Sequence, residues 1–397
     1  MPDPITALLT DDTVAAARHF LERTDEVTVA RQAALSGVPA PTGAEGARGA
    51  RVAELFREVG LRDVRTDAVG NVLGLLGDTA GGNGDGCVVV AAHLDTVFGP
   101  EVRVEVEHRE QRLLGPGISD NARGLAALVA LAEALGRSRV PLEKPVLFAA
   151  TVGEEGAGDL RGVKHLFGDG FRPSAFIALD GAGAERIVHR ALGSRRYRVT
   201  YRGPGGHSWA AFGVANPASA VGRAVAAVAE LEFPAEPRTT CAAVRIGGGT
   251  GLNSIPQEAW LDLDLRSEDP AALKELDKKV QGILNRAADA ENKRRAAGTQ
   301  PLRVEATLVG DRPSGVTPRA HPLVQAALQA TRALGKSPEL ASASTDANVP
   351  IARGIPAICL GAGGKSGDTH LPTEWYENEE GVTGLVRAML VVCAMGR

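Results

Sequence analysis

The chain has 397 residues, of which 44% are hydrophobic and 23% are charged, as is usual for a globular protein. This supply of apolar side chains is enough for a large core and excludes a mainly disordered chain. Acidic residues (48) slightly outnumber basic ones (44), and only 4% of residues are aromatic. A nucleic-acid partner is therefore not expected, because such proteins need a basic surface or stacking side chains.

The sequence predicts a cytoplasmic protein with no membrane partner. Residues 1–12 lack the basic start and apolar stretch of a secretory signal, and no window approaches the ~20 apolar residues that span a bilayer. The four cysteines are too far apart for a CxxC motif and lie in or beside apolar runs, so we expect buried free thiols.

Both ends of the chain alternate between helical and strand patterns. Continuous apolar runs predict strands buried on both faces of a parallel or mixed sheet, at 70–77, 87–97, 145–155, 175–181 and 355–363. Capping residues and helical periodicity predict helices at 13–35, 44–59, 123–136, 321–334, 345–353 and 379–393. The fold class is thus α/β, with a mixed, mainly parallel sheet sandwiched by helices.

The middle of the chain has a different pattern. Apolar and polar residues alternate over 195–203 and 259–267, which is typical of an antiparallel sheet with one solvated face. A further strand at 301–310 and helices at 216–232 and 270–297 complete an α+β pattern. We therefore predict a catalytic metal-binding domain from residues 1–193 and 312–397, interrupted by an inserted domain over 194–311.

Side chains that bind metals or transfer protons follow the predicted strands of the first domain. Because ligands bind beyond the carboxyl ends of the strands in open α/β sheets, these side chains are expected to meet in one crevice. One more acid stands at the entry to the 123–136 helix. The set is His93, Asp95, Asp120, Glu154, Glu155, Asp180 and His370.

Several carboxylates buried together need a positive counter-charge. Mixed imidazole and carboxylate ligands suit zinc best, with manganese or cobalt possible. In the arrangement that we expect, Asp120 bridges two divalent ions, His93 and Asp180 complete one site, and Glu155 and His370 complete the other. Glu154 is then free to act as general base, and Asp95 can orient the His93 ring.

Other classes of enzyme are not supported. Ser119 lacks the second glycine of a G-x-S-x-G elbow, and Cys359 replaces the first glycine of a phosphate-binding loop ending in Lys365-Ser366. No HExxH or GxGxxG motif occurs. A catalytically inactive metal-binding module stays open as an alternative. In the inserted region, His207 lies in the glycine-rich stretch GPGGHSWAAFG, where an exposed imidazole could reach a substrate.

The order and spacing of seven motifs resemble one family of dizinc metallopeptidases. The motifs are HLDT (93–96), GISDN (117–121), GEE (153–155), LDG (179–181), GGHS (205–208), LDLRS (263–267) and GDTH (367–370). The superfamily contains peptidase T, aminoacylase, carboxypeptidase G and succinyl-diaminopimelate desuccinylase. The resemblance implies the two-metal assignment above.

The same resemblance implies roles for the inserted domain, as a lid and as the surface of a homodimer. His207 would stabilise the oxyanion in its own or the partner subunit, and Arg266 and Asn253 would contact the substrate. It also implies a cis peptide bond between Asp120 and Asn121. The glycines around Gly363 would let the backbone approach the substrate closely.

One residue points to a branch of the superfamily. The ligand after the third strand is Asp180, and in similar proteins Asp at this place goes with aminopeptidases and dipeptidases. We therefore expect a peptidase T-like aminopeptidase that hydrolyses short peptides by a two-metal activated water. The alternative is an N-acyl amino acid deacylase or a carboxypeptidase G-like enzyme, whose substrate would be an acylated amino acid.

Overall fold

The computed structural model describes residues 4–78 and 86–397, which form two compact units. Unit 1 comprises Met1–Ala191 and Val316–Arg397, and unit 2 comprises Leu192–Gly315. The predicted α/β class with a mainly parallel central sheet is confirmed. Among the described residues, no helix is both long and apolar enough to cross a bilayer.

Unit 1 is built on a mixed sheet whose centre is parallel. Strands β6, β3, β7 and β17 run parallel to one another, whereas β2 and β8 pair antiparallel at the two sides. The strand order is β1 (Arg62–Thr66), β2 (Val72–Leu76), β6 (Val146–Thr151), β3 (Val88–His93), β7 (Ala175–Leu179), β17 (Ala357–Leu360), β8 (Arg186–Ala191) and β15 (Gly315–Val316), with β16 (Glu339–Ala343) also paired to β8.

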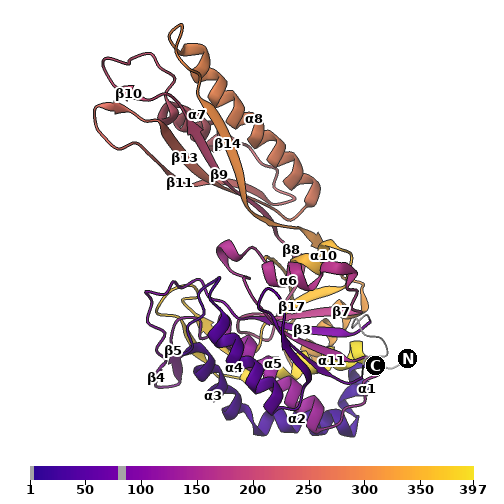
Figure 1. Ribbon diagram of the computed structural model, residues 1–397. Helices are drawn as coiled ribbons and strands as arrows, with labels where there is room; N and C mark the ends of the chain where they lie inside the picture. The colour runs from indigo at the N-terminus through magenta and orange to yellow at the C-terminus, as the bar shows by residue number, and fades with distance from the viewer. Residues whose placement is uncertain (1–3, 79–85) are drawn as a thin grey trace. The chain divides into compact units, whose positions relative to one another are not determined.

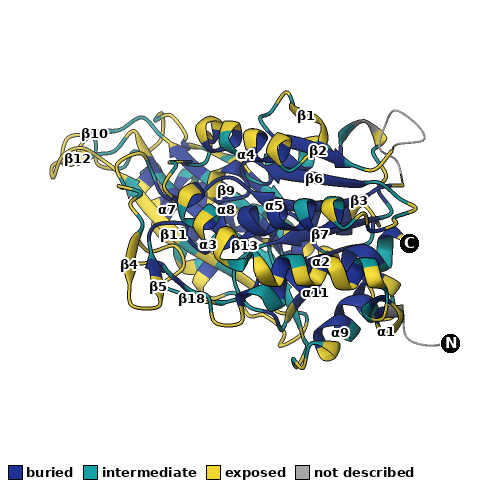
Figure 2. Ribbon diagram, turned by 90° about the horizontal axis from the view of Figure 1, so that it is seen from below, coloured by how far each residue is buried: buried dark blue, intermediate teal, exposed yellow. Residues whose placement is uncertain are grey.

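Helices cover both faces of this sheet, which explains the continuous apolar runs in its strands (Figure 1). In β3, Val88 and Val90 pack on one side and Val89 and Ala91 on the other, and all are fully buried. Figure 2 shows the central strands buried along their lengths. The first face carries α1 (Pro4–Leu9), α2 (Asp12–Arg23), α3 (Asp25–Ser36), α4 (Gly46–Glu58), α5 (Ala122–Arg137), α9 (Pro322–Ala333) and α11 (Gly381–Gly396); the second carries α6 (Arg161–Leu166) and α10 (Asn348–Ala352).

A second, small sheet of unit 1 lies in loop regions that the sequence analysis left unassigned. Its order is β18 (Lys365–Gly367), β19 (Trp375–Glu377), β5 (Arg112–Leu114) and β4 (Glu107–Arg109). Two short 3-10 helices occupy Gly156–Gly158 and Gly168–Gly170. The loop between β18 and β19 carries His370, so this sheet helps to place that histidine.

Unit 2 is a four-stranded antiparallel sheet with helices packed on one face. Its order is β11 (Thr239–Gly248), β13 (Glu258–Ser267), β9 (Gly193–Arg202) and β14 (Arg303–Arg312). Alternate residues of β9, among them Val199 and Tyr201, are buried against α7 (Pro217–Ala229) and α8 (Pro270–Arg294). A two-stranded ribbon, β10 (Gly206–His207) with β12 (Ser254–Ile255), completes the unit.

Three details differ from the sequence prediction. The single helix expected over 13–35 is two helices, α2 and α3, which meet at Thr24. Strands β1, β8, β11, β15 and β16 and helices α1 and α6 were not predicted, since their apolar runs are short or interrupted by charges. Of the four free cysteines, three are buried as expected and Cys241 is only half-buried.

The burial of the sheet predicts that truncating a valine in β3 costs more stability than truncating an exposed valine. Val90→Ala in β3 removes two fully buried carbons and should lower the free energy of unfolding of unit 1 by about 2 kcal/mol. Val27→Ala, at a position that is 47% exposed, should change it by less than about 0.5 kcal/mol. Urea denaturation followed by circular dichroism measures both, and equal losses would contradict this packing.

Candidate metal centre

The side chains expected at the metal centre all lie in unit 1. His93 is the last residue of β3, and Asp180 directly follows β7. Glu154 and Glu155 come shortly after β6. Since β3, β6 and β7 are parallel neighbours, their carboxyl ends lie at one edge of the sheet. Asp120 precedes α5, and His370 lies in the loop after β18.

Asp120 stands between the two histidines. Its Oδ1 is 3.0 Å from His93 Nε2, and its Oδ2 is 3.1 Å from His370 Nε2. On the His93 side, Asp180 Oδ1 is 3.7 Å from the same imidazole nitrogen. On the other side, Glu155 Oε1 is 3.1 Å from His370 Nε2. The two oxygens of one carboxylate thus face two separate groups of ligand atoms.

These distances fit two cation sites that share Asp120. The ligand atoms of His93, Asp120 and Asp180 lie within 4.8 Å of one another, and so do those of Asp120, Glu155 and His370. Two ligands bound to one zinc ion at ~2.0–2.2 Å and a tetrahedral angle lie roughly 3.3–3.6 Å apart. The Oδ1 atom of Asp120 is buried, and its 3.0 Å contact with His93 Nε2 does not have hydrogen-bond geometry, so this oxygen can bind a cation.

The carboxylates of the site raise the pKa values of both histidines. Burial alone would lower the pKa of His93, but its contacts with Asp120 and Asp180 outweigh burial and raise the pKa well above its usual range. Contacts with Asp120 and Glu155 raise the pKa of His370 to about 10. Burial would raise the pKa of Asp120, but the two histidines hold it well below its usual range. The site therefore stabilises positive charge between its carboxylates.

Asp95 fixes the loop after β6 more than the ring of His93. Its Oδ1 and Oδ2 accept hydrogen bonds from the backbone amides of Glu154 and Glu155, both at 2.9 Å, and Oδ2 also accepts from the Thr42 hydroxyl at 2.8 Å. The His93 Nδ1 lies 3.0 Å from the backbone carbonyl of Asp95 and 3.6 Å from its carboxylate. The backbone carbonyl, rather than the expected carboxylate, thus makes the shorter contact with the ring.

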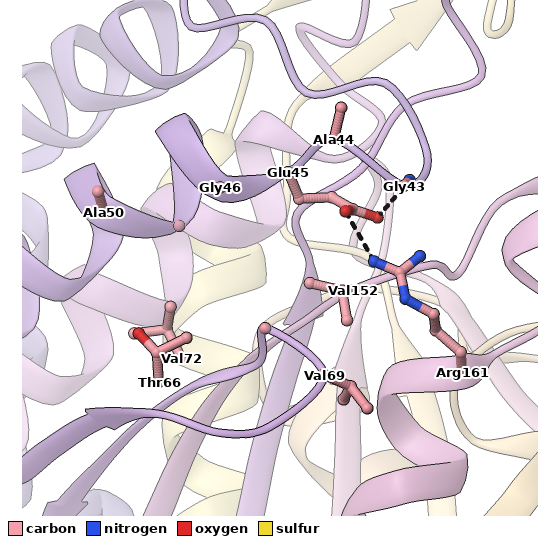
Figure 3. A pocket seen from close by; sticks show the side chains of 12 residues that line it. Gly43, Ala44, Glu45, Gly46, Ala50, Thr66, Val69, Val72, Val152 and Arg161 are labelled. Atoms are coloured by element: carbon pink, nitrogen blue, oxygen red, sulfur yellow. Dashed lines mark hydrogen bonds and ion pairs between the residues drawn. The ribbon is translucent and has the colours of Figure 1, made fainter.

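The loop after β6, which carries Glu154 and Glu155, is held through four consecutive backbone amides. The amide of Val152 donates to Asn71 Oδ1 (3.0 Å) and that of Gly153 to Glu45 Oε1 (3.2 Å), and the next two donate to Asp95. Figure 3 shows the Glu45 carboxylate between the Gly43 amide (2.9 Å) and the Arg161 guanidinium (2.7 Å). These residues border a cavity of about 330 Å³. Glu45 is buried, and its ion pair with Arg161 fixes the carboxylate that accepts from the Gly153 amide.

The loop that carries Asp120 is held in a similar way by Glu374. One oxygen of this buried carboxylate accepts from the amides of Ser119 and Asp120, both at 2.8 Å, and the other accepts from Gly117 at 3.1 Å. Burial raises the pKa of Glu374 to about 7. The Asn121 side chain donates to the carbonyl of Leu179, which links the start of α5 to the end of β7. The expected cis peptide bond between Asp120 and Asn121 is confirmed.

Asp346 is a buried acid near His93 that the sequence analysis did not single out. The Asp346 carboxylate accepts a hydrogen bond from the hydroxyl of Thr151, the residue that pairs with His93 across β3 and β6. Burial raises its pKa to about 6. Glu45, Glu374 and Asp346 do not belong to any of the seven motifs. In the sequence each is a single acid, near the start of a helix or, for Glu374, shortly after GDTH (367–370).

The other predicted site residues are placed as follows. His207 and Asn253 lie at the β10–β12 ribbon of unit 2, where the Ser208 amide donates to the Asn253 carbonyl at 2.8 Å. Arg266, on β13 of the same unit, donates to Asp264 at 2.8 Å. Gly363 belongs to unit 1, and a Cβ there would lie 1.9 Å from the carbonyl of Gly381. Its backbone packing against α11 is by itself a reason for glycine.

Comparison with known proteins agrees with this geometry. The profile of peptidase family M20/M25/M40 matches residues 89–393, well over half of the chain. No curated protein matches at a significant level.

Several solved structures share the fold. The aminopeptidase PepT of Bacillus cereus ATCC 10987 is 21% identical, with a TM-score of 0.74 over 94% of this chain and 99% of that one. A tripeptidase of Staphylococcus aureus subsp. aureus Mu50 is 19% identical, with a TM-score of 0.76 over 93% and 98%. A dinuclear metal-binding M20 peptidase of Bacillus subtilis is 15% identical, with a TM-score of 0.66 over 95% and 98%.

The matched region contains every side chain of the metal centre described above. With donor atoms grouped for divalent cations at the edge of an α/β sheet, the chain belongs to peptidase family M20/M25/M40 and is a metal-dependent hydrolase.

Proposed function

We propose that this protein is a peptidase T-like aminopeptidase that hydrolyses short peptides with two divalent metal ions, zinc being the best fit. The observation that carries the hydrolytic mechanism is the position of Asp120 between His93 and His370, with further carboxylates on both sides. In this proposal His93, Asp120 and Asp180 hold one ion, and Asp120, Glu155 and His370 hold the other. When bound, the ions polarise the scissile carbonyl and lower the pKa of the attacking water.

Glu154 is the proposed general base. It is buried, its backbone amide is fixed by Asp95, and its carboxylate groups with His93 and Glu155 within 4.8 Å. It is not needed in either of the two ligand sets above, so its carboxylate can take a proton from the attacking water and pass it to the leaving amine. Asp95 and Glu45 act on the reaction by positioning this loop.

His207 is the proposed donor to the oxyanion. Its Nδ1 accepts from the backbone amides of Trp209 (3.2 Å) and Ala210 (3.4 Å). In the neutral ring the proton therefore resides on Nε2, which can donate to a developing negative charge. Arg266 is proposed to bind a carboxylate of the substrate, with Asn253 and Gly363 contributing further contacts.

The preference for peptides with a free amine rests on Asp180 and on the two fold neighbours that are named as an aminopeptidase and a tripeptidase. The alternative substrate is an acylated amino acid. The deciding experiment compares Ala-Ala-Ala, Ala-Ala and N-acetyl-alanine as substrates of the zinc-loaded protein. We expect the tripeptide to have the highest kcat/KM. Faster cleavage of N-acetyl-alanine would instead identify a deacylase, and no turnover of any substrate would favour the inactive module.

A homodimer through unit 2 is also part of the proposal. Strand β11 is at the edge of its sheet, and its Val244 and Ile246 are 56% and 63% exposed. An exposed edge strand with apolar side chains favours pairing with a second copy of the chain. We further propose the cytoplasm as the compartment, since all four cysteines are free, as is usual in a reducing environment.

Removal of the base gives the first test of the mechanism. Glu154→Gln should keep both ions but lower kcat by about 10²–10⁴-fold, because the water loses its proton acceptor. Metal content and peptide hydrolysis are measured on the same preparation. Glu230→Gln, an exposed position in unit 2, is the matched control and should hydrolyse at the normal rate. A Glu154→Gln enzyme close to full activity would exclude Glu154 as the base.

Metal binding should compete with protons. The carboxylates around His93 and His370 raise the pKa of both imidazoles, and an imidazole nitrogen must lose its proton to bind a cation. Zinc binding should therefore release protons and weaken as the pH falls from 8 to 6. Calorimetry in two buffers of different ionisation enthalpy measures the release.

The same titration tests the ligand assignment. The protein should take up two zinc ions, His370→Ala only one, and His108→Ala, an exposed histidine of β4, two. Two tightly bound ions in His370→Ala, or zinc binding without proton release, would contradict the proposed ligands.

The support behind the catalytic loop can be tested through Glu45. Glu45→Ala removes the acceptor for the Gly153 amide and leaves Arg161 unpaired, and kcat should fall about tenfold. KM and zinc content should change little, because Glu45 is not a ligand. Glu54→Ala serves as the control, because Glu54 is an exposed residue of α4, the helix that begins one residue after Glu45. If kcat of Glu45→Ala equals that of the control, the loop does not depend on this contact.

A further inference from the structure

Arg186, the first residue of β8, borders a cavity of about 290 Å³ in unit 1 that is also lined by Asp120 and Asp180. This cavity therefore adjoins the proposed metal centre. Most of its other lining is polar. Five hydroxyl side chains contribute to it: Ser119, Ser344, Thr345, Ser366 and Thr369.

The guanidinium of Arg186 has no partner among the residues that the structure describes. No carboxylate in residues 4–78 or 86–397 lies within ion-pair distance of it, although Asp120 and Asp180 line the same cavity. Those two acids are already in contact with His93, and Arg186 is exposed. Arginine offers five donors in a planar fork that suits a carboxylate, and here all of them are available.

The backbone around Arg186 is fixed by hydrogen bonds from α11. The fully buried Arg387 of α11 donates to the carbonyls of Ala184 (2.5 Å), Arg186 (3.1 Å) and Gly361 (2.9 Å). These bonds link the start of β8 to the end of β17. The Arg186 side chain therefore starts from a rigid point of the fold, which reduces the conformational entropy that recognition of a ligand costs.

We propose that Arg186 is a specificity residue that binds a carboxylate of the substrate inside this cavity, so that the enzyme prefers short peptides with an acidic group near the scissile bond. The hydroxyl groups around the cavity can donate to the same carboxylate. The inference rests on the proposed peptidase function and adds the substrate class. It differs from the role proposed for Arg266, which belongs to unit 2 and is paired with Asp264.

The carboxylate could belong to an acidic side chain or to the C-terminus of the peptide. Two sets of peptides distinguish these sources. The first replaces each residue of Ala-Ala-Ala in turn by Glu or by its neutral isostere Gln. The second compares Ala-Ala-Ala with its C-terminal amide. Each peptide is assayed with the zinc-loaded wild-type, Arg186→Gln and Arg186→Lys proteins.

In the wild type, at least one carboxylate-bearing peptide should have a kcat/KM about tenfold or more above that of its neutral partner, mainly through KM. Arg186→Gln should abolish this ratio while leaving the neutral peptide within about twofold, and Arg186→Lys should keep part of it. Arg57→Gln, an exposed arginine of α4, should behave as the wild type. Loss of the Glu-to-Gln ratio identifies a side chain, and loss of the acid-to-amide ratio identifies the C-terminus.

The proposal is overturned if Arg186→Gln leaves every ratio unchanged, or lowers kcat/KM of all peptides equally. Binding to zinc-loaded Glu154→Gln protein, with and without Arg186→Gln, gives a second readout that needs no turnover. If the wild type cleaves none of the peptides, the proposed function fails. Tenfold tighter binding of an acidic peptide that disappears with Arg186→Gln would still support the carboxylate site, and equal binding would refute it.

Discussion

The metal centre depends on positive charge that offsets the repulsion between the carboxylates gathered at one edge of the sheet. Asp120, Glu155 and Asp180 meet within a few ångströms of two imidazoles, and Glu154 lies beside them. Like charges this close and this buried are stable only with a positive counter-charge. The carboxylates raise the pKa values of both histidines, so the site stabilises positive charge, as a metal-dependent hydrolase requires.

Three further acids hold the loops that carry the candidate ligands. Their hydrogen-bond donors are backbone amides. Asp95 binds the amides of Glu154 and Glu155, Glu45 binds that of Gly153, and Glu374 binds three amides around Asp120. Each carboxylate thus fixes the backbone of a loop. This arrangement explains how side chains from separate loops can be held close to one another at the end of β3.

The sequence was sufficient to predict the central strands of the large sheet and the proximity of the candidate ligand side chains. Strands such as β3 are apolar on both faces, so their pattern shows that they are covered on both sides, and the polar residue at the end of each strand then lies at the common edge. The helix break at Thr24 was not predictable in this way, because no glycine or proline marks it in residues 13–35. Strand β11 was missed because charge and glycine interrupt its alternation.

The supporting residues were harder to find for a physical reason. Glu45 looks like an ordinary acid at the start of a helix, and only the fold brings it to Gly153, 108 residues away. Glu374 is a similar case, since the amides that it binds lie in the loop before α5. Arg186 is another, since loop residues form most of the cavity that it borders. Periodicity describes which face of an element is buried, but it contains no information about contacts between loops.

The most direct test of the account is the position of the metal ions themselves. Crystals of the protein grown with zinc, measured at the zinc absorption edge, should show two anomalous peaks, one on each side of the Asp120 carboxylate. The first should lie within bonding distance of His93 and Asp180, and the second within bonding distance of Glu155 and His370. A fully loaded crystal with one ion, or with ions that Asp120 does not contact, would contradict the central claim.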